Sequence, residues 1–105
     1  MIKVICMDDS KKPSEIPASH WVKKGTKYHI THISKMMNQG FILGCDLSEI
    51  NLLDLDTPYN CFRLSRFGVQ LKDLEKLQQL IKDCAELNDI EIDLDKILEE
   101  QVELI

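Results

Sequence analysis

The chain has 105 residues, of which 44% are hydrophobic and 30% are charged, and its formal net charge is −5. This length predicts one domain, and this composition is typical of a globular protein and excludes extensive disorder. No segment approaches the about 20 apolar residues that cross a membrane, and the apolar start is too short for a signal peptide. We therefore expect a cytoplasmic protein that does not contact a membrane.

The charge is unevenly distributed along the chain. Residues 1–82 have a balance of +3, whereas residues 83–105 have a balance of −8, with Lys96 as their single basic residue. Such a split is consistent with a basic surface for a polyanion and an acidic tail for something else. It is equally consistent with two parts of one domain that attract each other.

The sequence contains four cysteines, Cys6, Cys45, Cys61 and Cys84. In a secreted protein they could pair as disulfides, but a cytoplasmic protein keeps its thiols reduced. We therefore expect four free thiols that act mostly as small buried apolar side chains.

Short strands are expected in the first part of the chain. Residues 2–6 alternate with a period of two, which predicts a first strand. Residues 8–19 contain Asp, Ser and two prolines, which favour a loop, and Gly25 suits a tight turn. Residues 26–33 are rich in Thr, Tyr and Ile and predict a second strand.

The next segment continues as a meander. A turn at 38–40 leads to a third strand at 41–43. Residues 46–58 fit a strand followed by a turn, and residues 59–67 fit either a last short strand or a single helical turn, with both arginines outside the core. Four or five such strands must curl to bury their apolar face, which favours a small, partly open barrel.

The apolar period changes from two to 3.6 near Val69, and residues 69–88 therefore predict an amphipathic helix. A connector follows, and then a second short helix capped by Asp93 or Asp95. We expect this acidic end to cover an open side of the barrel.

Three short motifs follow one another in residues 1–68. They are a V-x-C-x-D strand at 4–8, a strand with Gly25, Tyr28 and Ile30, and a closing R-F pair at Arg66 and Phe67. In these motifs the segment resembles small uncharacterised proteins of gut bacteria, their phages and other mobile elements, which look like SH3-like barrels. The resemblance implies a fold, and it supplies no catalytic residue.

The expected fold class is therefore α+β. A small, mostly antiparallel SH3-like β-barrel occupies residues 1–68, and residues 69–105 form a C-terminal amphipathic helix and a short acidic helical end. This helical extension packs either on the barrel or on a partner.

No catalytic motif is present, and we expect neither an enzyme nor a cofactor. The sequence lacks G-x-S-x-G, a phosphate-binding G-x-x-x-x-G-K and H-E-x-x-H. His29 and His32 are three residues apart, and residues at odd spacing point to opposite faces of a regular strand. Because a metal site also needs three or four ligands, we expect no metal.

Two binding surfaces are candidates. A lysine-rich edge with an aromatic residue suits a polyanion such as nucleic acid, although the sequence pI of about 5.1 argues against a dedicated nucleic-acid-binding protein. Its residues are Lys11, Lys12, Trp21, Lys23, Lys24, Lys27 and Lys35.

The helix offers the second surface, because its apolar stripe is wider than one small barrel can cover and also suits a homodimer. The stripe residues are Leu74, Leu77, Ile81 and Cys84. We expect a non-enzymatic accessory or adaptor protein of a mobile element, with a nucleic-acid-binding barrel as the alternative.

Overall fold

The computed structural model describes residues 1–36, 42–55 and 57–105, and in these residues the chain has an α+β fold with one curled sheet of six strands and two α-helices. The strands are β1 (Ile2–Cys6), β2 (Lys27–Lys35), β3 (Leu43–Leu47), β4 (Phe62–Arg63), β5 (Phe67–Val69) and β6 (Glu103–Leu104). The helices are α1 (Leu74–Leu87) and α2 (Leu94–Gln101). Neither described helix is both long and apolar enough to cross a membrane.

The sheet is mixed, and its strand order is β4-β3-β2-β1-β5-β6. Every neighbouring pair is antiparallel except β5 and β6, which run parallel with Gly68 opposite Glu103. The first strand is central, because it pairs with β2 through Val4 and Tyr28 and with β5 through Val4 and Val69. The sheet can therefore curl back toward its own start, as a half-closed barrel does.

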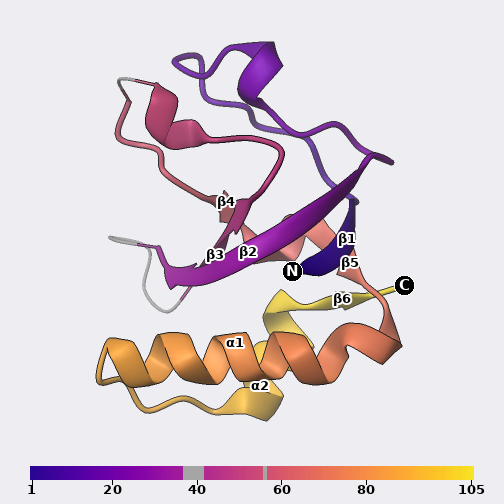
Figure 1. Cartoon of the computed structure of the whole chain (residues 1–105), viewed down its shortest axis with the longest axis vertical. Helices are drawn as coiled ribbons and strands as arrows, with labels where there is room; N and C mark the ends of the chain where they lie inside the picture. Colours follow the sequence, from indigo (N-terminus) through magenta and orange to yellow (C-terminus); the bar gives the residue numbers. More distant parts are fainter. Residues whose placement is uncertain (37–41, 56) are drawn as a thin grey trace.

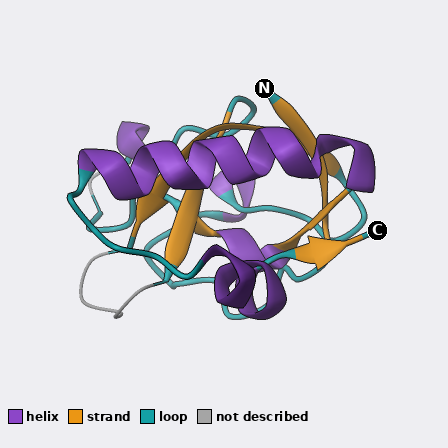
Figure 2. Ribbon diagram, turned by 90° about the horizontal axis from the view of Figure 1, so that it is seen from below, coloured by secondary structure: helices purple, strands orange, loops and turns teal. Residues whose placement is uncertain are grey.

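The core lies between the concave side of this sheet and α1. Alternate residues of β1 are buried, and so are Tyr28 and Ile30 of β2, as expected for strands with one face in the core. From the other side, α1 packs against β2 and buries Leu77 and Ile81. Figure 2 shows α1 crossing the strands, with α2 and β6 beside it.

The predicted strand at 26–33 and the predicted helix at 69–88 are confirmed. The strand is β2, and the helical segment consists of a 3₁₀ turn at Leu71–Asp73 followed by α1. The second helix is also present, and Asp93 is its N-cap, since the Asp93 side chain accepts a hydrogen bond from the backbone N–H of Lys96 at 3.3 Å.

Several predicted boundaries in the middle of the chain are wrong. The third strand runs over Leu43–Leu47, and the expected turn at 38–40 lies outside the described residues. Beyond β3, the segment expected to be a strand and a turn contains a 3₁₀ turn at Leu52–Asp54. Residues 59–67 combine both alternatives, because β4 is followed directly by a 3₁₀ turn at Leu64–Arg66.

The end of the chain also differs from the expected helix. α2 stops at Gln101, and β6 then joins the sheet, where the backbone N–H of Ile105 donates to the carbonyl of Val69 at 3.0 Å. The expected barrel boundary at residue 68 consequently falls inside β5. The free edge of β5 explains this arrangement, because its backbone groups gain partners when β6 pairs with them.

Two long connections, residues 7–26 and 48–61, lie on the opposite side of the sheet from the helices (Figure 1). Both are loops with short 3₁₀ turns, one at Ala18–His20 and one at Leu52–Asp54. The candidate functional site lies between the first of these loops and the segment that ends in η3, Leu64–Arg66.

Candidate binding groove

The expected lysine-rich edge is only partly assembled by the fold. Lys27 and Lys35 are the two ends of β2, which places them about 26 Å apart at about 3.3 Å per residue. Lys12 is used within its own loop, where its Nζ donates to the carbonyl of Pro13 at 3.1 Å and to that of Ile16. Lys11, Lys23, Lys24 and Lys27 are exposed in or next to the first long loop. Lys35 therefore does not belong to the same surface.

Trp21 is half-buried and fixed at three places. Its ring packs against the ring of Phe62 at a centroid distance of 5.4 Å, and the guanidinium carbon of Arg66 lies 4.9 Å from the Trp21 ring centroid. The indole Nε1–H donates to the carbonyl of Asp9 at 2.7 Å. One face of the indole is therefore covered by a cation, so Trp21 is not the open stacking platform that the sequence suggested.

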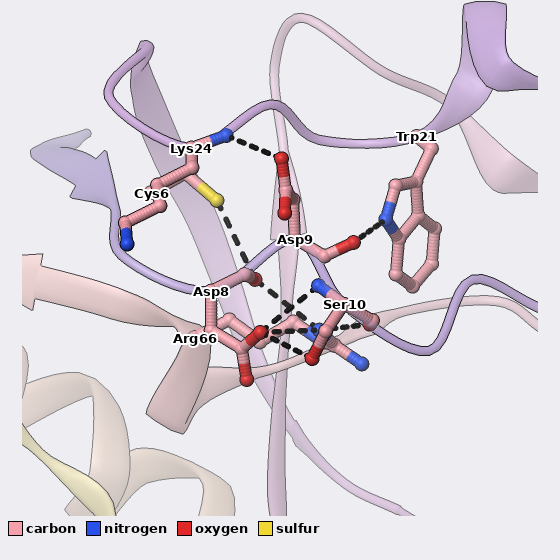
Figure 3. Close-up of polar contacts among 7 residues, drawn as sticks. All are labelled: Cys6, Asp8, Asp9, Ser10, Trp21, Lys24 and Arg66. Atoms are coloured by element: carbon pink, nitrogen blue, oxygen red, sulfur yellow. Dashed lines mark hydrogen bonds and ion pairs between the residues drawn. The ribbon is translucent and has the colours of Figure 1, made fainter.

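The turn at Asp8–Ser10 organises this region, as Figure 3 shows. The backbone N–H and the hydroxyl of Ser10 donate to Asp8 Oδ1 at 2.9 and 2.5 Å. These hydrogen bonds lower the pKa of the Asp8 carboxyl, and the charges of Arg66 and Lys11 act in the same direction. The turn is thereby closed around an ionised carboxylate.

Arg66 connects this turn to the end of β4. Its Nη1 donates to the carbonyls of Asp8 and Ser10 at 3.2 and 2.8 Å, and it lies 3.7 Å from Asp8 Oδ1. The Arg66 side chain is only 12% exposed. The adjacent Asp9 carboxylate accepts the backbone N–H of Lys24 at 3.0 Å, which joins the two ends of the long loop.

A cavity of about 360 Å³ opens beside Trp21, between the first long loop and residues 59–66. We call it the Trp21 groove. Its wall is formed by Asp8, Ser10, Lys11, Pro13, Ile16, Trp21, Met36, Tyr59, Cys61, Phe62, Arg63, Ser65 and Arg66. This volume is in the range of about 300–1,000 Å³ that is usual for ligand pockets.

The sequence predicted two groove residues, Lys11 and Trp21, and missed three others, Tyr59, Arg63 and Arg66. It assigned Tyr59 to the core, whereas that side chain is 38% exposed. The usable signal was the spacing of the arginines, which flank a 3₁₀ turn and so present two cations beside one loop. Their position opposite Trp21 depends on contacts between segments over 40 residues apart.

The proposed dimer stripe is occupied within the chain itself. Leu77, Ile81 and Cys84 are buried, and Leu74 is half-buried. Because α1 uses these side chains against β2, they are not accessible to a second copy unless the core opens. Sequence periodicity cannot separate a stripe that covers the chain's own sheet from one that covers a partner.

The histidines do not converge on a metal site. His29 lies beside Glu49, with 2.6 Å between Nδ1 and Oε2, whereas His32 Nδ1 lies 3.1 Å from the hydroxyl of Thr31. Burial alone would raise the pKa of Glu49, but hydrogen bonds from the His29 ring and backbone outweigh it and lower this pKa. Across the described ranges, no three His, Cys, Asp or Glu side chains form a group that could hold a metal ion.

The four cysteines carry free thiols, of which Cys61 lines the Trp21 groove. Burial raises the pKa of Cys61, and also that of the fully buried Cys45. Cys45 is paired with Phe62, so Cys61 points to the other face of the sheet by strand alternation. A disulfide between Cys45 and Cys61 is therefore not favoured by this geometry.

Comparison with known proteins finds no match: no family model fits the chain, and neither a curated protein nor a solved structure is significantly similar to it. The geometry of the groove is therefore the basis for a functional conclusion.

Proposed function

We propose that this protein is a non-enzymatic adaptor that binds a segment of another protein in the Trp21 groove. The observation that carries the proposal is the groove itself, a cavity of about 360 Å³ with aromatic and apolar side chains on its wall and cations at its border. Concave sites that are largely apolar, with a few fixed polar groups, are the usual form of a binding site. The resemblance to small barrels of mobile elements supports an accessory role and an SH3-like identity for the curled sheet.

The groove is held in shape without a ligand, which favours binding over a loop that folds only on contact. Arg66 ties the Asp8–Ser10 turn to the chain beyond β4, and Asp9 ties the turn to Trp21 and Lys24. A preformed site loses less conformational entropy on binding. The same loop would otherwise be long enough to be mobile.

The chemistry of the wall supports binding rather than catalysis. Among the groove residues, the hydroxyl of Ser10 donates to Asp8, and burial raises the pKa of the Cys61 thiol and disfavours the reactive thiolate. No histidine lines the Trp21 groove, although histidine is the usual activating base for such nucleophiles.

Nucleic-acid binding is the second candidate, and one observation favours it. Lys11, Lys23, Lys24 and Lys27 are exposed close together in sequence, in or next to the first long loop. Two findings favour a protein ligand instead, because Arg66 covers one face of Trp21 and Lys35 lies at the far end of β2. A stacking platform and a continuous basic track are what single-stranded nucleic acid needs.

The proposal is tested with a displayed library of short random peptides that is sorted against the immobilised full chain. Ser65 is exposed and lines the groove, so Ser65→Trp fills it, whereas Lys82→Trp adds the same side chain on the exposed side of α1. We expect enriched peptides to bind the wild type and Lys82→Trp equally and to lose binding to Ser65→Trp. Enrichment that is unaffected by Ser65→Trp, or no enrichment at all, would refute the groove as a protein-binding site.

A further inference from the structure

The charges of the Trp21 groove are unbalanced in favour of cations. Lys11, Arg63 and Arg66 are in its wall, whereas Asp8 is its one acidic residue. The Asp8 carboxylate already accepts two hydrogen bonds from Ser10 and lies 3.7 Å from Arg66. Its charge is therefore used within the turn, and the groove is left with a positive field although the whole chain has a net charge of −5.

The three cations have different roles. Arg66 is 12% exposed and is held by the carbonyls of Asp8 and Ser10, so it positions the loop. Lys11 and Arg63 are exposed residues on opposite sides of the groove, one from the first long loop and one from β4. A ligand in the groove would therefore meet a cation on both sides.

The backbone at Lys11 supports a functional role for this residue. Its φ is 60°, in the left-handed region that residues other than glycine, asparagine and aspartate rarely adopt. Residues held in such conformations occur preferentially at ligand-binding sites, where the surrounding structure maintains them. Here the closed Asp8–Ser10 turn lies directly before Lys11.

The wall between these cations is apolar and aromatic. Pro13, Ile16, Trp21, Tyr59 and Phe62 contribute to it, and the cavity of about 360 Å³ has room for one or two side chains of a ligand. Tyr59 and Trp21 are only partly buried, so each has surface left to contact a ligand. A ligand that satisfies the whole groove has an apolar side chain next to negative charge.

We infer that the ligand of the Trp21 groove is an acidic peptide segment in which an aromatic or large aliphatic residue is flanked by Asp or Glu. This inference rests on the proposed function and adds the chemistry of the partner. The apolar side chain packs between Trp21 and Tyr59, and the flanking carboxylates pair with Lys11 and Arg63. Carboxylates suit this site better than a phosphate backbone, because the acidic remainder of the chain repels a long polyanion but not a short segment.

The test uses the peptides enriched from the random library and is read from their composition and binding. Trp21 is the single tryptophan of the chain, so with a peptide that lacks tryptophan its fluorescence reports occupation of the groove directly. We expect the enriched peptides to be acidic with one apolar residue. Binding should weaken about fivefold or more for Lys11→Glu and for Arg63→Glu, and further at high salt.

The matched control is Lys82→Glu, which makes the same change of charge on the exposed side of α1. Its effect should be less than about twofold, because charges separated by more than about 8 Å are largely screened at physiological salt. A scrambled-charge peptide with Gln in place of each acid should bind weakly to the wild type.

The outcomes separate the two proposals. Enriched peptides that are neutral or basic but depend on the groove would overturn the acidic ligand and leave the adaptor proposal standing. Equal effects of Lys11→Glu and Lys82→Glu would also overturn it. A single-stranded oligothymidylate that quenches Trp21 fluorescence, and does so more strongly than any enriched peptide, would replace the protein ligand with nucleic acid.

Discussion

The guanidinium of Arg66 lies 4.9 Å from the ring centroid of Trp21, and the same side chain donates to the carbonyls of Asp8 and Ser10 at 3.2 and 2.8 Å. One arginine thus joins the wall of the groove to the turn that closes its end. Arginine suits this position because its planar guanidinium stacks on an aromatic ring while its N–H groups donate in the plane.

The first prediction concerns this arginine. Arg66→Ala should lower the free energy of unfolding by about 2 kcal/mol, since a cation–π contact and hydrogen bonds from a charged donor are removed together. Arg66→Lys should recover only part of this loss, because a single ammonium cannot stack on Trp21 and also reach both carbonyls. Urea unfolding followed by the fluorescence of Trp21 measures both effects.

The control for Arg66 is Lys72→Ala, because Lys72 is exposed in the 3₁₀ turn before α1 and lies outside the groove. It should change stability by less than about 0.5 kcal/mol. Equal losses for Arg66→Ala and Lys72→Ala would show that Arg66 does not hold the loop.

The second prediction concerns pH and the pair of His29 and Glu49. The folded-state pKa of Glu49 is lowered from its ordinary value of 4.5, so the unfolded chain binds the proton more readily. The resulting stabilisation is fully present above pH 4.5 and is lost as pH falls through the lower folded-state pKa. Glu49→Gln should therefore flatten the acid side of the stability curve, measured by thermal unfolding from neutral to acidic pH.

Asp54→Asn serves as the comparison for Glu49→Gln, because Asp54 is an acidic residue in the same connection that also accepts a hydrogen bond. The expected result is a smaller change in the pH dependence for Asp54→Asn. If Glu49→Gln leaves the acid limb unchanged, the hydrogen bonds between Glu49 and His29 do not contribute to stability in solution.

The third prediction concerns close packing at Gly44 in β3. A Cβ at this position would lie 2.5 Å from Cys61 Sγ and 3.2 Å from the carbonyl oxygen of Phe62. Gly44→Ala should therefore destabilise the protein by about 1–3 kcal/mol through overpacking. Adding Cys61→Ala should relieve part of this cost, because the nearest atom is removed while the Phe62 carbonyl remains.

A double-mutant cycle in urea measures the coupling between Gly44 and Cys61, and it should be larger than about 0.5 kcal/mol. Strict additivity of the two substitutions would contradict the contact between this strand and the groove segment.

The fourth prediction separates core from surface on the helical segment. Leu77 is 0% exposed and Leu71 is 69% exposed. Leu77→Ala should cost about 2–5 kcal/mol of unfolding free energy, whereas Leu71→Ala should cost less than about 0.5 kcal/mol. Both variants are compared with the wild type by denaturation and by light scattering.

This pair of variants also tests the dimer expected from the helix pattern. If Leu77 acts only in the chain's own core, Leu77→Ala will lose stability without any change in mass at fixed concentration among the folded molecules. A dimer that Leu77→Ala dissociates, while the monomer keeps its stability, would assign the stripe to self-association.

The sequence alone predicted the elements whose signal is local. A period of two located β1 and β2, and the change to a period of 3.6 located α1, because the side chains that define these periods are only a few residues apart. It also predicted the N-cap at Asp93, since capping depends on the next three residues. These patterns are sufficient for an α+β fold with a curled sheet.

Tertiary structure decided which surfaces are used. The apolar stripe at Leu77 and Ile81 is equally suitable for a dimer and for a sheet, and the position of β2 determined that it covers the sheet. The strand β6 has only two residues and no pattern of its own, and it forms because β5 has an edge to pair with.

The groove likewise exists only in the folded chain. Trp21 and Arg66 are 45 positions apart, and neither residue type indicates by itself that the two side chains stack. The sequence predicted a basic edge with a tryptophan, and the fold removed Lys35 from it and added Tyr59, Arg63 and Arg66. Local periodicity determines the elements, but a binding site depends on which loops meet, and that is determined by contacts between distant segments.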